Sequence, residues 1–167
     1  MSQQLNQTIK GKTISYVKAN QSPHSFAWYY GNPDDYDNLL SGKTVGMSYP
    51  VAGMIEVEVE DCRMVFFDGP FIRFYDNLKK VPKKHQLYVE FDDGTALVCT
   101  IQMYGGLWAF HESELSKIDN KYYLGAKEKP SPLTDQFDRE YFRSLRTDDS
   151  GKLSAKAFLA TGQRIPG

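Results

Sequence analysis

The histidines and cysteines of the 167-residue chain are the first residues to consider for metal or nucleophilic chemistry. His24, His85 and His111 lie far apart, without the HxxxH or HExxH spacing that puts two rings on one helix face. Cys62 and Cys99 form no CxxC pair, and neither lies in a sequence typical of a catalytic thiol. We therefore expect no metal site in this chain, and two reduced thiols in a cytoplasmic protein.

Carboxylates suited to acid–base chemistry occur together in two places. Glu56, Glu58 and Glu60 alternate with apolar residues, which predicts a strand whose glutamates face solvent. The aspartates of residues 34–37 follow an Asn-Pro pair and predict the start of a helix over 33–41. No GxSxG sequence marks a nucleophile. From these residues alone we assign no catalytic residue.

The composition is that of a globular protein, with 41% hydrophobic and 25% charged residues. No apolar run reaches the ~20 residues needed to cross a bilayer, and the N-terminal residues do not form a signal peptide. The net charge is −1, but residues 1–120 hold 11 Lys and Arg against 15 Asp and Glu, whereas residues 121–167 hold 9 against 6. This asymmetry, with a further basic cluster over 79–84, suits either a surface that binds a polyanion or an ordinary solvated surface.

Turn residues divide the central part of the chain into short strands. Asp92-Asp93-Gly94 lies between two apolar runs and predicts a hairpin. Asp68-Gly69-Pro70 predicts a second turn. Six or seven strands are expected between residues 10 and 110, which favours an antiparallel β-sandwich with a preceding helix over 2–9.

After residue 111 the pattern becomes helical. A helix is expected over 133–145 with Thr134 as its N-cap, and a second over 154–161 with Ser154 as its cap. Residues 119–131 are predicted to be a linker. We therefore expect an α+β chain, with a β-sandwich domain over 1–125 followed by a helical piece over 126–167.

Two passages in the last third of the chain carry a family resemblance. Residues 123–137 read YLGAKEKPSPLTDQF, and residues 154–167 read SAKAFLATGQRIPG. The first resembles the LG-x-x-PL-(S/T)-x-x-F passage that joins the two domains of formamidopyrimidine-DNA glycosylases and endonuclease VIII-type enzymes. The second is similar to the IK-x-x-L-x-x-Q-x-x-x-x-G-(I/L)-GN segment of their helix–two-turn–helix module. The β half matches in pattern, so the resemblance covers essentially the whole chain.

The resemblance implies a base-excision repair enzyme that removes damaged, oxidised bases from DNA and cleaves the backbone by β/δ elimination. In that family the amine of an N-terminal proline forms a Schiff base with the sugar, and a glutamate follows the proline. The damaged base is rotated out of the stack. The resemblance further implies DNA as partner, no membrane, no small-molecule cofactor, and zinc only in a full-length parent protein.

Several interior positions depart from the family's pattern. The family's strand lysine falls at Met54. Of the Met, Arg and Phe that fill the gap left by the flipped base, the first falls in the turn 68–70, the second at Gln102 and the third at Tyr104. The phosphate-binding KHDH sequence is shortened to residues 84–86. These changes indicate a divergent branch of the family.

Carried over position by position, the resemblance implies DNA-binding roles for Lys156, Lys83, Lys84, His85, Gln102, Tyr104 and Arg164. Lys156 matches a lysine that contacts phosphate, and Tyr104 matches the wedge at a base step. Each residue also has a plainer interpretation. Lys156 suits an ordinary surface position, Tyr104 a core or edge aromatic, His85 and its lysines a solvated hairpin, and Arg164 a contact with a helix end.

Three functional readings stay open at this point. The first is a truncated or divergent domain of a DNA glycosylase and AP lyase. The second is a catalytically dead DNA-binding or protein-interaction module of the same fold. The third is an unrelated β-sandwich protein.

Borohydride trapping tests the expectation about catalysis. The chain starts Met1-Ser2 without the family's Pro-Glu pair, and it ends before the family's zinc finger, so we expect a fragment without the nucleophile. No covalent adduct should form with a duplex that contains an abasic site, whereas a glycosylase with an N-terminal proline should be trapped in parallel. An adduct with this chain would contradict the expectation and would point to a lysine, such as Lys12 or Lys156, as the amine.

Overall fold

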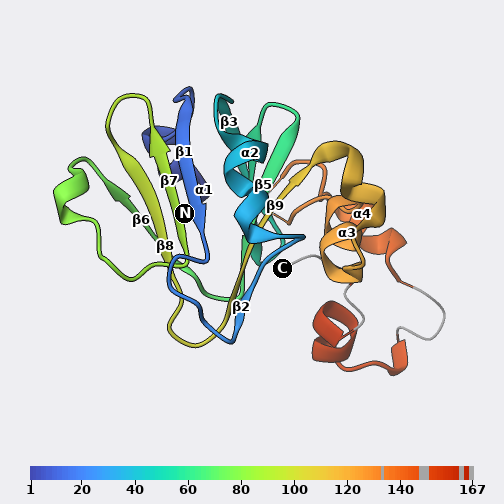
Figure 1. The fold of residues 1–167 in the computed structure, drawn as a ribbon. Helices are drawn as coiled ribbons and strands as arrows, with labels where there is room; N and C mark the ends of the chain where they lie inside the picture. The colour runs from blue at the N-terminus through green and yellow to red at the C-terminus, as the bar shows by residue number, and fades with distance from the viewer. Residues whose placement is uncertain (133, 147–150, 162–163, 166–167) are drawn as a thin grey trace. The chain divides into compact units, whose positions relative to one another are not determined.

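The protein is described by a computed structural model over residues 1–132, 134–146, 151–161 and 164–165. The chain divides into two compact units, one of residues 1–50 and 54–117 and the other of residues 51–53 and 118–167. Strands dominate the first unit, whereas the elements that begin in the second unit are short helices (Figure 1). The expected domain boundary at residue 125 lies within a helix of the second unit.

Nine strands and several short helices form the first unit. Its helices are α1 (Ser2–Thr8), η1 (Pro33–Asp35), α2 (Tyr36–Leu40), η2 (Leu78–Lys80) and η3 (Glu112–Lys117). Its strands are β1 (Ile14–Ala19), β2 (Ala27–Trp28), β3 (Val45–Val51), β4 (Met54–Val59), β5 (Cys62–Phe67), β6 (Phe71–Tyr75), β7 (Leu87–Phe91), β8 (Ala96–Thr100) and β9 (Gly105–His111).

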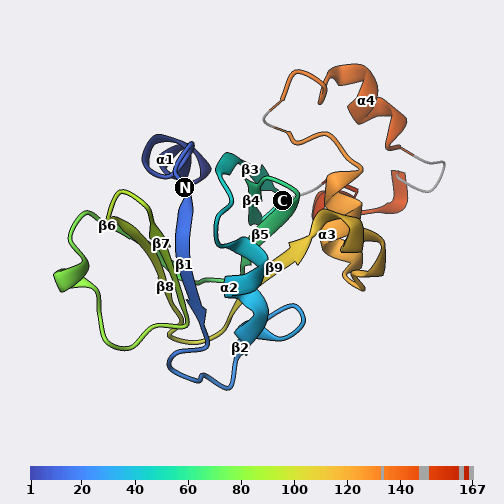
Figure 2. The same cartoon turned by 45° about the horizontal axis from the view of Figure 1, so that its top comes forward.

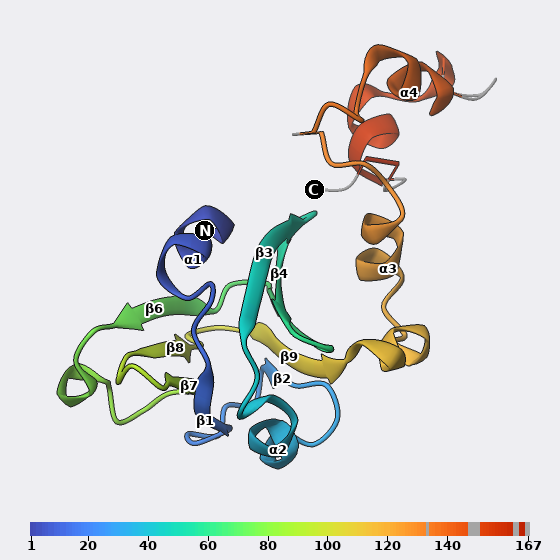
Figure 3. The same ribbon diagram turned by 90° about the horizontal axis from the view of Figure 1, so that it is seen from above.

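The strands form two sheets, which confirms the β-sandwich expected over residues 10–110. One sheet has the order β1-β7-β8-β6 and the other the order β2-β9-β5-β4-β3. The pairs β1–β7, β7–β8, β6–β8, β4–β5 and β5–β9 are antiparallel, and the short pair β2–β9 is parallel. Between the sheets lies an apolar core, to which α1 contributes Leu5 and α2 contributes Leu40. The two helices lie at opposite ends of the space between the sheets (Figures 2 and 3).

The helix predicted over 33–41 is confirmed, and its start follows the expected chemistry. Asn32 has extended backbone, and its side-chain oxygen accepts a hydrogen bond from the Asp34 amide at 3.2 Å. The first turn is a 3-10 helix, after which α2 continues to Leu40. Gly42 then adopts φ +82°, a conformation that L side chains rarely take, and the chain turns into β3.

Tyr36 joins this helix to the centre of the second sheet. Its side chain is buried, and its hydroxyl oxygen accepts hydrogen bonds from the amides of Tyr30 at 3.0 Å and Ala109 at 3.1 Å. The hydroxyl proton lies within reach of the carbonyl of Leu107, at 3.0 Å. Because β2 pairs with β9 only at residues 105 and 106, the hydroxyl takes the place of a strand along the next part of β9.

One prediction about β4 is wrong. Glu56, expected to face solvent, is only 4% exposed and lies 3.5 Å from the guanidinium of Arg63 on the neighbouring strand β5. Glu58 is half-buried and accepts a hydrogen bond from the amide of Met47 on β3. Only Glu60, which follows the strand, is exposed. The alternating pattern therefore predicted the strand correctly, but Arg63 on β5 and the backbone of Met47 on β3 interact with the glutamates that were expected to face solvent.

The second unit differs from its predicted elements. The expected linker over 119–131 contains helix α3 (Lys121–Lys127), whose cap Asn120 accepts from the amide of Tyr123 at 2.9 Å. The helix expected over 133–145 is only α4 (Arg139–Ser144), because Asp138 caps it and the Thr134 hydroxyl instead donates to the Ser131 carbonyl. Leu133 lies outside the described residues.

The last predicted helix is present in altered form. The Ser154 hydroxyl accepts from the amide of Ala157 at 3.2 Å, which confirms Ser154 as the cap. The turns that follow are wider than those of an α-helix, and η5 (Ala157–Thr161) is a short π-helix. None of the helices in the described part of the chain is long and apolar enough to cross a membrane.

Replacing Tyr36 by phenylalanine tests the strand-like role of its hydroxyl. Tyr36→Phe leaves the buried amide of Ala109 and carbonyl of Leu107 without this partner, so the free energy of unfolding should fall by about 1–3 kcal/mol. Denaturant unfolding measures the change. Tyr16→Phe, which removes a hydroxyl from an exposed tyrosine, is the control and should leave stability nearly unchanged. Equal stabilities of the two variants would contradict the assignment.

Candidate nucleic-acid interface

Three loops meet at the start of β9. The amide of Gly105 donates to the carbonyl of Phe26 at 3.0 Å, which joins the loop before β9 to the segment before β2. A methyl group at Gly105 would lie 3.1 Å from Pro70, and one at Gly69 would lie 3.6 Å from the carbonyl of Tyr104. The structure therefore brings together the turn 68–70 and residues 102–104, the positions at which the resemblance places the family's gap-filling residues.

Aromatic side chains of these loops stack on one another. The ring of Trp28 lies 6.0 Å from that of Tyr104, with 27° between the planes, and 6.4 Å from that of Phe67, with 21° between the planes. Phe67 in turn meets the edge of Trp108 at 4.7 Å. We call Trp28, Phe67 and Tyr104 the aromatic stack. The family resemblance marks Tyr104 as a candidate, whereas no sequence pattern marks Trp28.

Gly106 makes room for the aromatic stack. A methyl group at this position would lie 2.0 Å from two carbons of the Phe67 ring, far closer than any van der Waals contact. Phe67 and Gly106 are partners in the β5–β9 register, so the ring lies over the backbone of the neighbouring strand. The Gly105-Gly106 pair, visible in the sequence, is the signal that could have indicated a close approach here.

The stack belongs to a larger exposed apolar surface. Tyr104 is 47% exposed and Trp28 41%, and their neighbours Met103 and Phe26 are 71% and 58% exposed. Large apolar side chains at this level of exposure cost free energy in water unless a partner covers them. Of the plainer interpretations of Tyr104, the core position is therefore wrong, whereas an exposed aromatic at the edge of the fold is compatible with its 47% exposure.

A groove of about 620 Å³ lies beside these loops and contains two of the predicted DNA-binding residues. Lys84 and Gln102 both line it, together with His24 from the loop before β2. None of the residues described along this groove is acidic. Lys84 and the polar side chains of its mixed lining suit a phosphate or the edge of a base.

Gln86 fixes the two walls of the groove. Its side chain is 7% exposed and donates to the carbonyl of Ser22 at 2.9 Å, while its amide oxygen accepts from the backbone of Ile101 at 2.7 Å. The backbone carbonyl of Gln86 accepts from the hydroxyl of Tyr29 at 3.0 Å. Burial raises the pKa of Tyr29 to about 12, which keeps this donor protonated. In the sequence, Gln86 is visible only as part of a shortened phosphate-binding sequence, which predicts no role for it.

The other predicted basic residues of the first unit lie near this groove along the chain. Lys83 and Lys84 are exposed. His85 is half-buried, with its Nδ1 atom 2.9 Å from the carbonyl of Pro82 and its ring 5.6 Å from that of Tyr88. Two lysines thus present free positive ends to solvent, while the histidine shapes the loop that carries them.

The remaining predicted residues belong to the second unit. Lys156 is exposed, in the first turn after the Ser154 cap. Arg164 is half-buried and donates to the carbonyl of Leu145, the residue that ends α4, at 2.9 Å. Its guanidinium also lies 5.1 Å from the ring centre of Phe158. The helix-end contact considered for Arg164 is therefore present, and its role toward DNA stays a prediction.

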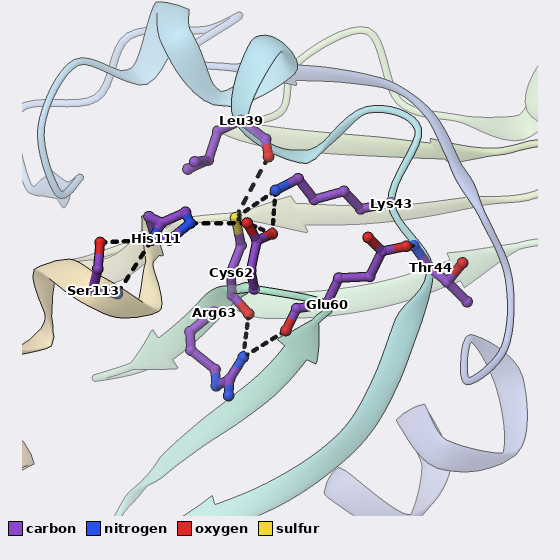
Figure 4. Close-up of polar contacts among 9 residues, drawn as sticks. Leu39, Lys43, Thr44, Glu60, Cys62, Arg63, His111 and Ser113 are labelled. Atoms are coloured by element: carbon purple, nitrogen blue, oxygen red, sulfur yellow. Dashed lines mark hydrogen bonds and ion pairs between the residues drawn. The ribbon is translucent and has the colours of Figure 1, made fainter.

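A polar cluster at the β4–β5 turn is the other concentration of chemically capable groups (Figure 4). Asp61 accepts from Lys43 and lies 2.8 Å from Nε2 of His111, whose other nitrogen lies 2.7 Å from the hydroxyl of Ser113. The thiol of Cys62 lies 3.3 Å from the Lys43 ammonium. Sequence analysis did not foresee this cluster, because its members are far apart in the chain.

The cluster is poorly suited to nucleophilic chemistry. Cys62 is fully buried, and burial raises the pKa of its thiol, so the reactive thiolate is disfavoured. The hydrogen bond from Lys43 holds the pKa of Asp61 at about 2, so this carboxylate stays ionised and is a poor proton donor.

Within the described residues no group of three or more His, Cys, Asp and Glu side chains could hold a metal ion. At the family's lysine position, Met54 is 4% exposed and contributes no charge.

Comparison with known proteins gives a likeness in fold. No protein-family model matches the sequence, and no curated protein matches it. The Lactococcus lactis Fpg in complex with DNA containing an abasic site matches with a TM-score of 0.72 and 19% identity, over 99% of this chain and 60% of that one. MutM in complex with DNA containing carbocyclic 8-oxo-G matches with a TM-score of 0.64 and 19% identity, over 86% and 52%. The chain thus has the Fpg fold and spans little more than half the length of those structures.

The polar cluster predicts a stability that depends on pH. The depressed pKa of Asp61 means that its contribution is fully present above the ordinary carboxyl pKa of about 4 and is lost as the pH falls through about 2. Asp61→Asn should lower Tm by about 1–3 °C at pH 5, and the difference from the unmodified chain should shrink toward pH 3. Thermal unfolding at the two pH values measures it. A difference that does not change between them would contradict the ion pair, and Lys43→Met should show the same profile.

Proposed function

We propose that this chain is the DNA-binding part of a base-excision repair glycosylase and AP lyase of the formamidopyrimidine-DNA glycosylase type. The observation that carries the proposal is the meeting of the turn 68–70 with Tyr104, next to a groove lined by Lys84 and Gln102, in a protein with the Fpg fold. Within the first unit, Lys84, considered from sequence as a phosphate contact, lies in the same groove as Gln102, two residues before the proposed wedge Tyr104, and this supports the proposal.

In the proposed complex different exposed side chains contact the base stack, the base edges and the phosphates. Tyr104 and Met103 enter the duplex at the damaged base and occupy the space that the base leaves when it rotates out. Gln102 offers an amide to the edge of a neighbouring base. Lys83 and Lys84, and Lys156 in the second unit, contact phosphates and set the orientation without reading sequence.

The chemical step is proposed for the whole parent protein and not for residues of this chain. Removal of an oxidised base and cleavage of the backbone need an amine that attacks the sugar, and we assign no such amine here. The chain by itself is expected to be inactive. A cytoplasmic location is also proposed, because Cys62 and Cys99 are both buried thiols without a disulfide, in line with a reducing compartment.

A catalytically dead DNA-binding module is the second candidate. Two observations favour it: Met54 is buried at the position of the family's strand lysine, and the turn 68–70 replaces the gap-filling methionine. Excision assays on a duplex with an oxidised base, using the complete parent protein, distinguish the candidates. Product formation supports the enzyme, and tight binding without product supports the module.

Salt titrations test the proposed phosphate contacts. Each contact releases counterions, so log affinity should fall by about 0.9 for every unit of log salt per contact. With two or three contacts, binding of this chain should be weak, near 10⁻⁴ M or poorer at physiological salt. The double variant Lys83→Ala/Lys84→Ala should flatten the slope by up to about 2, and Lys156→Ala by about 1, without changing sequence preference.

Lys10→Ala is the matched control, because Lys10 is exposed and lies at the end of α1, outside the loops of the proposed interface. Its slope should equal that of the unmodified chain. If the lysine variants keep both affinity and slope in low salt, the proposed interface is in the wrong place.

A further inference from the structure

We infer that Trp28 is a base-stacking residue, and that the aromatic stack forms a platform for one unpaired nucleobase of DNA. The inference rests on the proposed function, because it assumes that DNA meets this surface. It adds a residue of β2, a strand to which neither the resemblance nor the charge pattern gave a role.

The position of Trp28 is fixed by backbone and not only by side-chain packing. Trp28 pairs with Gly106 in the parallel β2–β9 pair, and the preceding residue pairs with Gly105. The amide of Ala27 donates to the carbonyl of His24 at 3.0 Å, which closes a turn just before the strand. A ring held in this way loses little conformational freedom when a base stacks on it.

Trp28 is the member that contacts both other rings of the stack. The planes of Tyr104 and Phe67 lie within 27° and 21° of its own, so the three rings present nearly parallel faces. A nucleobase stacks by the same geometry, and every base has a face that can take part.

The surroundings favour DNA over an apolar protein partner. Lys84 lies in the adjoining groove, whose described lining carries no carboxylate, and Lys83 is exposed beside it. Residues 21–28 and 101–104 contain no acidic residue, and Asp68 is the one carboxylate of the third loop. Exposed parallel rings beside a basic groove are the arrangement by which proteins bind unstacked bases.

The test compares two DNA duplexes of equal length in low salt, one fully paired and one with a single unpaired base. The unmodified 167-residue chain should bind the second more tightly. Trp28→Ala should reduce this preference by about tenfold or more, because stacking is lost while phosphate contacts stay, and its salt slope should not change. Trp28→Phe should keep most of the preference.

Tyr49→Ala is the control, because Tyr49 is also 41% exposed but lies on β3, at the opposite edge of the sheet from β2. Its preference should equal that of the unmodified chain. Tryptophan emission gives a second readout that does not depend on the alanine variant folding. The unpaired base should quench emission in the unmodified chain, and the quenching should be absent in Trp28→Phe, which keeps only Trp108.

The outcomes separate the two proposals. If the unmodified chain binds neither duplex, the proposed function fails and this inference fails with it. If it binds both duplexes equally, with the expected salt slope and no quenching, the DNA-binding function stands and the inference about Trp28 is overturned. A preference that is lost in Trp28→Ala but kept in Tyr49→Ala, together with quenching that is lost in Trp28→Phe, supports it.

Discussion

The hydroxyl of Tyr36 forms hydrogen bonds with backbone groups along one edge of β9, the strand at whose start the candidate interface lies. The strand β2 pairs with β9 at only two residues, and beyond them the hydroxyl bonds to the backbone of Leu107 and Ala109. Because a side chain satisfies these groups, the chain can leave the sheet immediately after Trp28 and continue into α2.

The elements that could be predicted from sequence are those fixed by local chemistry. The hairpin at 92–94 and the helix capped by Asn32 depend on residues within one turn, and both are present. The predictions that were wrong involve either a partner on another strand or a competing choice between two possible helix caps. Glu56 is buried because Arg63 across the hairpin neutralises it. In the second unit, Asp138 rather than Thr134 caps the helix, and the cap Asn120 starts a helix that contains Gly125.

The candidate interface shows the same difference between features marked by the sequence and features that depend on distant contacts. Gln102, Tyr104 and Lys84 were identified because a family pattern marks their positions, and the structure places them around one groove and one stack. Trp28 and Gln86 were missed. Their importance comes from contacts with residues far along the chain, Trp28 with Tyr104 and Gln86 with Ser22. Periodicity and spacing carry no information about such contacts.

The contact between Phe67 and Gly106 links two positions that must change together. A side chain of any size at 106 would occupy the space of the ring, so it requires a smaller residue at 67. Losing the ring at 67 would in turn remove one neighbour of Trp28. Among related sequences, an aromatic residue at 67 should therefore occur with glycine at 106, and this covariation would identify the sequences that can form the aromatic stack.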